Sequence, residues 1–308
     1  MKMRDQLSIP YFDNVMPRRF GDLYTTFLVE DVAQNVWPFG YGASERKGSV
    51  ELKPNDKNVR RILTAALDRN GHGFESSIQE FLTKAAGQVA EHDFAVAEIV
   101  FTQEANTNKV QDVDFVWINP LHIIRRWGRL YQRVPVELAA ERGIKSRILL
   151  PPERIMVFSA PARYRKPLAQ VREALSIMSD HRNDFFTLQA MEQNLQFDFV
   201  EHNRARMLAL AEAGRPIGYA CRGMFNEQAA TPYWIRLKIL HELFLIELRQ
   251  SLLMTLNAGL KKTGERMGFE GQIEVNGWPT HHDVEVALNQ LDAGAPSLVE
   301  ILDTFSRR

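Results

Sequence analysis

Phe94-Ala-Val-Ala-Glu-Ile-Val-Phe101 is the stretch that decides the fold. Its residues alternate and are rich in side chains that favour extended backbone, so it predicts a β-strand. A polar turn with two asparagines follows from Glu104 to Lys109, and Val113-Asp-Phe-Val-Trp-Ile118 reads as a returning strand. Together they predict a β-hairpin.

Upstream of this hairpin we expect two helices. Asn55 to Asp68 has apolar residues at helical spacing, and Asp56 is placed to cap its first turn. Phe74 to Glu91 is the stronger helix, with its apolar residues on one face. The stretch before Pro54 is rich in glycine, proline and aromatic residues. It predicts an irregular arm that packs on something larger, with one short helix near Asp22 to Gln34.

Downstream of the hairpin the pattern predicts short strands and then long helices. The expected strands lie around 123–131, 147–150, 154–158 and 272–275, and the expected helices lie at 167–191, 199–213, 233–261, 281–291 and 296–305. Pro167 suits a helical first turn. Strands grouped between helices indicate an α+β fold, not alternating βαβ units.

Composition limits the class of protein. The 308 residues carry 38 Lys plus Arg and 38 Asp plus Glu, so the formal net charge is zero. This balance argues against a module that grips DNA through its phosphates, but it is compatible with DNA passing through a channel. A single cysteine, Cys221, indicates a reducing, intracellular setting.

No targeting or membrane segment is expected. The N-terminus lacks the apolar core of a signal peptide. The most apolar segment, Ile239 to Leu260, is interrupted by charged residues such as Glu242 and Arg249, so it does not predict a membrane span. We therefore expect a soluble protein.

Signatures of catalysis are weak. The glycine pairs lack the spacing of nucleotide-binding loops. His281, His282 and Asp283 are adjacent and would point apart on a helix, which favours a polar helix start over a metal site. His92 and Asp93 leave open an unrecognised hydrolase, although a turn is the simpler interpretation. We expect no enzyme activity, no cofactor and no metal.

Three segments in order resemble tailed-bacteriophage portal proteins. The first runs from Glu91 to Val100, where Asp93 stands at a position that is often glycine in the family, and continues to Val116-Trp-Ile-Asn-Pro-Leu121. The second is Leu150-Pro-Pro-Glu-Arg-Ile-Met-Val-Phe158, followed by the helix from Pro167. The third runs from Ala229 through Leu256-Asn-Ala-Gly-Leu260 to Gly294-Ala-Pro-Ser297.

The resemblance implies a portal-like α+β fold, divided along the chain. An N-terminal arm would span 1–54, and a wing domain of helices and a β-meander 55–162. A stem with a short clip-like region would span 163–230. Residues 231–308 would form a second long helix, a returning wing segment and a minimal crown. The late helices are expected to be apolar on one side and to turn toward an axis shared by many copies.

The resemblance also implies a function and partners. Portal subunits form a ring, usually of twelve copies, at the capsid vertex of the virion, after assembly in the host cytoplasm. Double-stranded DNA passes through the ring without sequence readout, and the ring contacts the major capsid protein, the terminase and a head–tail adaptor. The alternative is a capsid-associated or head-completion protein that forms no channel.

Candidate site residues follow from this interpretation. An inward-facing arginine in each copy would form a belt of positive charge around the DNA. The candidates for this belt are Arg165, Lys166, Arg172 and Arg182, with Arg204 and Arg206 as second choices. The candidates for contact between subunits are the aromatic residues of the arm, Trp37, Phe39 and Tyr41.

Overall fold

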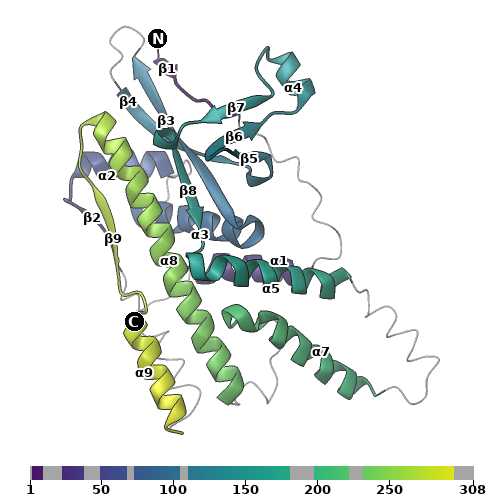
Figure 1. Cartoon of the computed structure of the whole chain (residues 1–308). Helices are drawn as coiled ribbons and strands as arrows, with labels where there is room; N and C mark the ends of the chain where they lie inside the picture. The colour runs from purple at the N-terminus through teal and green to yellow at the C-terminus, as the bar shows by residue number, and fades with distance from the viewer. Residues whose placement is uncertain are drawn as a thin grey trace.

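The computed structural model describes residues 2–9, 23–37, 49–67, 73–104, 110–180, 198–221 and 232–294 (Figure 1). Its helices and strands form a mixed α+β fold, as the sequence predicts. In the described residues, no helix combines the length and the apolar character that crossing a membrane requires.

The predicted hairpin is the centre of the main sheet. Strand β3 (Phe94–Glu104) pairs antiparallel with β4 (Val110–Ile118), with Val96 opposite Ile118. Strand β8 (Ile155–Ser159) pairs with the first half of β3, and β1 (Lys2–Arg4) pairs with the second half. Because β4 already occupies one side of β3 along both halves, β8 and β1 share the other side.

The strands do not form the single meander that was expected. A separate sheet contains β5 (Ile123–Arg126), β6 (Arg129–Arg133) and β7 (Arg147–Leu150), and the chain then returns to pair β8 with β3. Between these strands lie η1 (Pro120–His122), α4 (Val136–Glu141) and η2 (Pro152–Arg154).

The expectation of an irregular N-terminal arm is wrong for the described part of residues 1–54. Helix α1 (Leu23–Asn35) was expected, but β1 and β2 (Ser49–Lys53) were not. Strand β2 pairs antiparallel with β9 (Gln272–Asn276). Segments from the two ends of the described chain therefore form one two-stranded sheet.

The expected helices form with shifted ends, and residues 181–191 of the helix expected at 167–191 lie outside the described residues. The helices are α2 (Lys57–Leu67), α3 (Phe74–His92), α5 (Ala162–Asp180), α7 (Phe199–Gly214), α8 (Pro232–Met267) and α9 (His281–Asp292), with η3 (Arg215–Ile217) after α7. The cap at Asp56 is confirmed, because its carboxylate accepts the backbone N–H of Asn58 at 2.7 Å. Helix α5 begins at Ala162, before Pro167, so the expected start is wrong. The helix expected at 296–305 lies outside the described residues.

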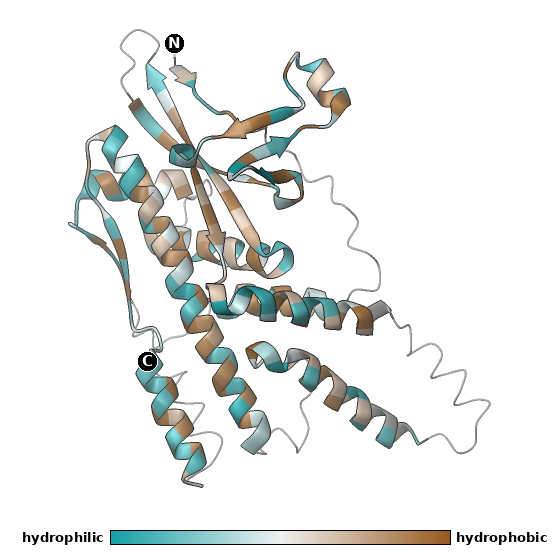
Figure 2. Cartoon of the chain, in the orientation of Figure 1, coloured by the Kyte–Doolittle hydropathy of each residue, from teal (hydrophilic) through white to brown (hydrophobic). Residues whose placement is uncertain are grey.

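Helix α8 runs past the main sheet and is part of the core. Figure 2 shows apolar segments along β3, β8 and the middle of α8. A Cβ on Gly259 would lie 2.1 Å from the sulfur of Met156, so a glycine lets α8 approach β8 closely. Lys262 Nζ donates to the carbonyls of Pro152 at 2.7 Å and Ile155 at 3.0 Å. Polar side chains of α8 thus cover carbonyls at the outer edge of β8.

This packing corrects the expectation for the late helix. The apolar residues of α8 are buried in the chain's own core. The side that remains exposed carries Met254, Ala258, Lys261 and Glu265. The expectation that α8 turns an uncovered apolar side toward a shared axis is therefore wrong.

Candidate functional site

The basic candidates on α5 fall into two groups. Arg165 and Arg172 are bound by the protein itself. Arg165 Nε donates to the carbonyl of Ala160 at 3.0 Å and its Nη2 to the hydroxyl of Ser159 at 3.1 Å. Lys166 is exposed to solvent. Arg165 is exposed as well, so among the described candidates on α5 Lys166 differs by having no hydrogen bond or ion pair to another described residue.

Arg172 joins α5 to the end of α3. Its two terminal nitrogens donate to both carboxylate oxygens of Asp93, at 2.9 and 2.7 Å, and one of them also reaches the carbonyl of Ala90 at 3.2 Å. This paired geometry is the strongest form of the arginine–carboxylate bond. Arg172 therefore fixes the position of α5 against the end of α3, and a role in contacting DNA would compete with that bond.

The backbone conformation of Asp93 is one that favours glycine. Asp93 ends α3 in the left-handed region, with φ of 70°. Glycine adopts this conformation without cost, and aspartate is among the few other residues that tolerate it. The sequence did not reveal that Arg172 would be its partner, because nothing local connects two residues this far apart.

The remaining candidates are scattered. On α7, Arg204 is exposed and Arg206 is half-buried. Arg182, Phe39 and Tyr41 lie outside the described residues. The described basic candidates therefore lie on two helices, with Arg165, Lys166 and Arg172 on α5 and Arg204 and Arg206 on α7.

Trp37 was expected at a contact between subunits, but it is part of the chain's own core. Its side chain is 2% exposed, and its ring meets that of Trp278 edge-on at 5.5 Å. The Trp37 indole has almost no surface left for a neighbouring subunit, so the structure argues against the predicted contact between subunits. The error came from treating the aromatic stretch as an arm.

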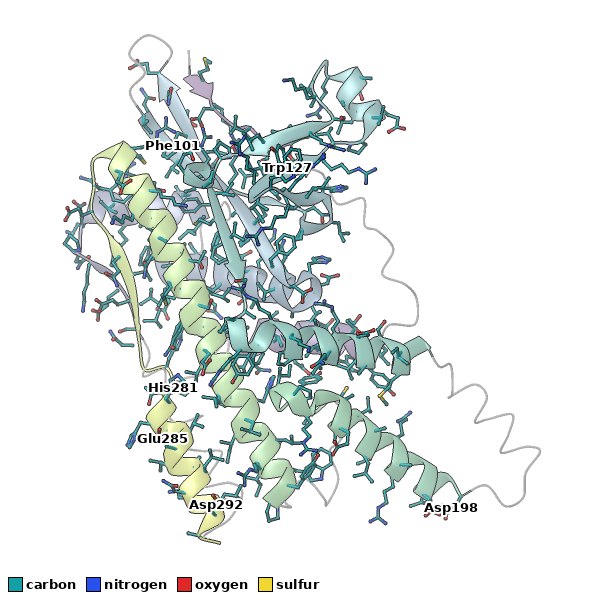
Figure 3. The ribbon with its side chains drawn as sticks, viewed as in Figure 1. Phe101, Trp127, Asp198, His281, Glu285 and Asp292 are labelled. Carbon is teal, nitrogen blue, oxygen red and sulfur yellow. The ribbon has the colours of Figure 1, made fainter. Side chains whose placement is uncertain are left out.

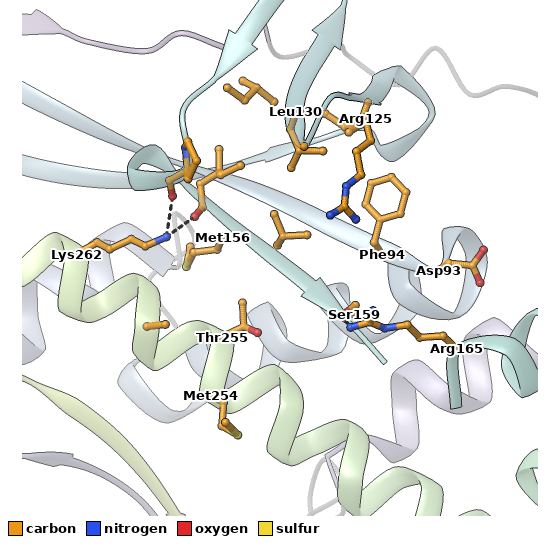
Figure 4. A pocket seen from close by; sticks show the side chains of 17 residues that line it. Asp93, Phe94, Arg125, Leu130, Met156, Ser159, Arg165, Met254, Thr255 and Lys262 are labelled. Carbon is orange, nitrogen blue, oxygen red and sulfur yellow. Dashed lines mark hydrogen bonds between the residues drawn. The ribbon is translucent and has the colours of Figure 1, made fainter. Parts of the chain in front are cut away.

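A groove of about 900 Å³ lies between β8, the β5–β6 hairpin and α8 (Figure 4). Its floor is apolar and includes Phe94, Leu130 and Val157. Arg125 and Arg165 stand along its rim (Figure 4). The sequence could not indicate this groove, because its residues come from elements that meet only in the folded chain.

Buried polar side chains hold the N-terminal segment against the sheets. Glu98 is 0% exposed, and its carboxylate accepts the backbone N–H groups of Leu7 at 2.7 Å and Ser8 at 2.8 Å. Gln132 exchanges two hydrogen bonds with the backbone of Ile9, at 2.9 and 2.8 Å. These bonds imitate strand pairing and place the segment between the main sheet and the β5–β6–β7 sheet.

The two residues of the hydrolase alternative, His92 and Asp93, have different charged partners in the folded chain. Asp93 is bound to Arg172, while the ion pair of His92 joins its Nε2 to Glu91 at 3.5 Å. Asp283 forms a capping box with Thr280 at the start of α9, so the polar helix start is confirmed. Across the described ranges, no group of three or more His, Cys, Asp or Glu residues could hold a metal ion.

Two buried side chains near α7 have shifted pKa values. Burial raises the pKa of Tyr219, whose hydroxyl donates to Asp31 at 2.9 Å. Burial lowers the pKa of His241, whose Nδ1 lies 3.2 Å from the carbonyl of Ile217. Both groups link α8, η3 and α1, and they serve the packing of the core.

A scan against protein-family models found no match, and a search of curated proteins found none either. The function of the chain therefore has to be inferred from its own residues and geometry.

Proposed function

We propose that this chain is the subunit of a bacteriophage portal ring, through which DNA is packaged and ejected and to which the tail is joined. The subunit would act at the capsid vertex as a structural protein without catalytic activity or a cofactor. Its partners would be copies of itself, the major capsid protein, the terminase, a head–tail adaptor and double-stranded DNA.

The observation that carries this proposal is the helical pair α5 and α7. The two helices run antiparallel and extend away from α8 and the sheets (Figure 1). Apolar side chains on this pair are left uncovered, namely Ile177 at 53% exposure, Val200 at 76% and Leu208 at 48%. Neighbouring copies arranged around an axis would cover such side chains.

The order of the elements supports the same proposal. A helix ending at Asp93 leads into the β3–β4 hairpin, and β8 then precedes the projecting pair. This is the order that the resemblance to portal proteins implies for a wing followed by a stem. The pair α5 and α7 would correspond to the stem.

The charges of the pair favour passage of DNA over tight binding. Lys166 and Arg204 are exposed on α5 and α7. Repeated around a ring, they would form a sparse belt of charge that attracts phosphates without base readout. Because the formal net charge of the chain is zero, strong retention of DNA is not expected.

Electron microscopy and native mass spectrometry of the full chain test the proposal. We expect rings with a central hole and a mass many times the 35.4 kDa of one chain. Ile177→Asp removes an exposed apolar side chain of α5 and should weaken ring assembly. Glu173→Gln changes only a charge on the same helix and should leave ring assembly unchanged. Compact monomers at every concentration would instead favour the channel-free head-completion protein.

A further inference from the structure

The tip of the β5–β6 hairpin carries a tryptophan in an unfavourable position. Trp127 is 84% exposed and adopts φ of 49°, and Gly128 follows with φ of 73°. Two consecutive positive φ angles define the tight hairpin turn that favours Asn-Gly, and a bulky residue at its first position is an outlier. Neither turn geometry nor burial within this chain explains a tryptophan here.

Arginines surround the exposed indole. The guanidinium carbon of Arg126 lies 4.3 Å from the centroid of the Trp127 ring. Arg125 and Arg129 flank the turn and are exposed. Tryptophan and arginine are the residue types that most often dominate the energy of protein interfaces. Trp127 and these arginines thus form an apolar knob with a positively charged rim; Figure 3 labels Trp127 on the hairpin.

A second groove, of about 1010 Å³, lies between α8 and the β2–β9 sheet. Apolar atoms of Met254, which is 72% exposed, and of Phe269 line it. Glu265 and Glu270 are exposed in its wall. Two lysines also line this groove, but Lys53 is paired with Glu274, which leaves Lys261 against the two glutamates. The groove is therefore lined by apolar atoms with a net negative rim, and it is large enough to admit an aromatic side chain together with its neighbours.

The knob and the groove lie on different sides of α8. In Figure 1 the β5–β6 hairpin is on one side of α8, and β9 is on the other. A contact between two different surfaces of the same chain is head-to-tail, and repeating it with a closing rotation generates a ring. A ring of this kind needs two distinct, complementary surfaces on each copy, and the knob and the groove are two such surfaces.

We propose that Trp127 of one copy inserts into the groove between α8 and β9 of the next copy, with the arginines of the hairpin facing Glu265 and Glu270. This inference rests on the proposed ring and names one of the surfaces that would close it. The occupant of the groove is thus a second copy of this chain.

Trp127→Asn is the decisive variant. Asparagine is favoured at the first position of this turn, so the hairpin should fold as well as before or better while the knob is lost. We expect the protein concentration at which rings dissociate, measured by mass photometry, to rise at least about tenfold. Glu265→Lys/Glu270→Lys should have the same effect by reversing the charge of the groove. Glu285→Lys, an exposed charge change on α9, is the matched control and should leave the rings unchanged.

Mixing the two deficient proteins tests the head-to-tail geometry. The Trp127→Asn protein keeps an intact groove, and the Glu265→Lys/Glu270→Lys protein keeps an intact knob. Their mixture therefore retains one good contact for each pair of chains. We expect one-to-one heterodimers at concentrations where each protein alone is monomeric.

One outcome would overturn the inference while the ring itself stands, namely that Trp127→Asn assembles at the wild-type concentration. If that variant also binds duplex DNA at least about tenfold more weakly, the knob is assigned to nucleic acid instead. If the wild-type chain never forms rings, the proposed function fails as well, so the two failures are distinguishable.

Discussion

Replacing Arg249 with methionine should lower the free energy of unfolding more than a substitution on the surface would. The Arg249 side chain is 1% exposed. Its guanidinium donates to the carbonyls of Val36 and Asn35, each at 2.7 Å, and forms an ion pair with Glu242. Helix α1 ends at Asn35, so a buried cation satisfies the last carbonyls of that helix.

The size of the effect follows from these contacts. Methionine fills a similar volume but donates no hydrogen bond, which leaves two buried carbonyls unpaired at about 1–3 kcal/mol each. Glu242, which is 18% exposed, also loses its partner. Breaking a buried ion pair on one side costs roughly 3–5 kcal/mol. We therefore expect Arg249→Met to lower the free energy of unfolding by roughly 3–5 kcal/mol.

Urea denaturation followed by circular dichroism measures this loss, at one fixed protein concentration below that of assembly. Glu242→Leu and the double variant complete a cycle that isolates the pair. The double variant should be more stable than the sum of the single losses predicts, since it removes both charges. A loss below about 1 kcal/mol for Arg249→Met would refute the reasoning, because two buried carbonyls without a hydrogen-bond donor should cost more than that.

Three further predictions can be checked by the same methods. Asp93→Ala and Asp93→Gly both lose the bond to Arg172, but glycine relieves the left-handed backbone that alanine disfavours. Asp93→Ala should therefore lower the free energy of unfolding by about 1–2 kcal/mol, and Asp93→Gly should stay within about 0.5 kcal/mol of wild type; equal losses would contradict this. Glu98→Ala should speed hydrogen exchange at the amides of Leu7 and Ser8, measured by mass spectrometry, since they lose their acceptor, and unchanged exchange would count against the clamp. Burial lowers the pKa of His241 from 6.5, despite the opposing influence of Glu242 and Asp31, so the stability it contributes should be present above pH 6.5 and fall away as the pH drops through its folded-state pKa. His241→Phe should therefore flatten the fall in melting temperature between about pH 7 and pH 5, and parallel curves for the two proteins would rule this out.

Local patterns predicted local structure well. The alternation in Phe94–Phe101 and the polar turn after it were enough for the β3–β4 hairpin, because both strands and their turn are continuous in the sequence. The helical spacing of apolar residues likewise predicted α3 and α8. In each case the sequence pattern and the element that it predicts cover the same continuous segment of the chain.

Distant contacts could not be predicted in this way. Strand β2 has only two buried positions, Val50 and Leu52, which is too short an alternation to stand out, and its partner β9 lies far along the chain. Arg249 looked like an interruption of an apolar helix, yet it is the cap of another helix. Its role depends on what α8 packs against, and no single segment contains that information.

The candidate site shows the same limit. Basic residues on α5 were found by type and spacing, but only the folded chain shows that Arg172 is bound to Asp93 while Lys166 is exposed. Trp127 was not chosen from the sequence. The sequence offered a tryptophan before a glycine in a hairpin as a signal. This signal indicates an interaction surface only once the φ angles and the exposure of Trp127 are known.

The pairing of β2 with β9 has a consequence for biosynthesis. A ribosome makes residues 49–53 early, yet their partner strand is complete only when residue 276 has left the exit tunnel. Until then, the groove wall built on this sheet does not exist, so a nascent chain would offer no complete groove to the proposed knob of a finished copy. Closure of the sheet would thus delay recruitment into the proposed ring until β9 has been made, which would protect growing chains from premature association.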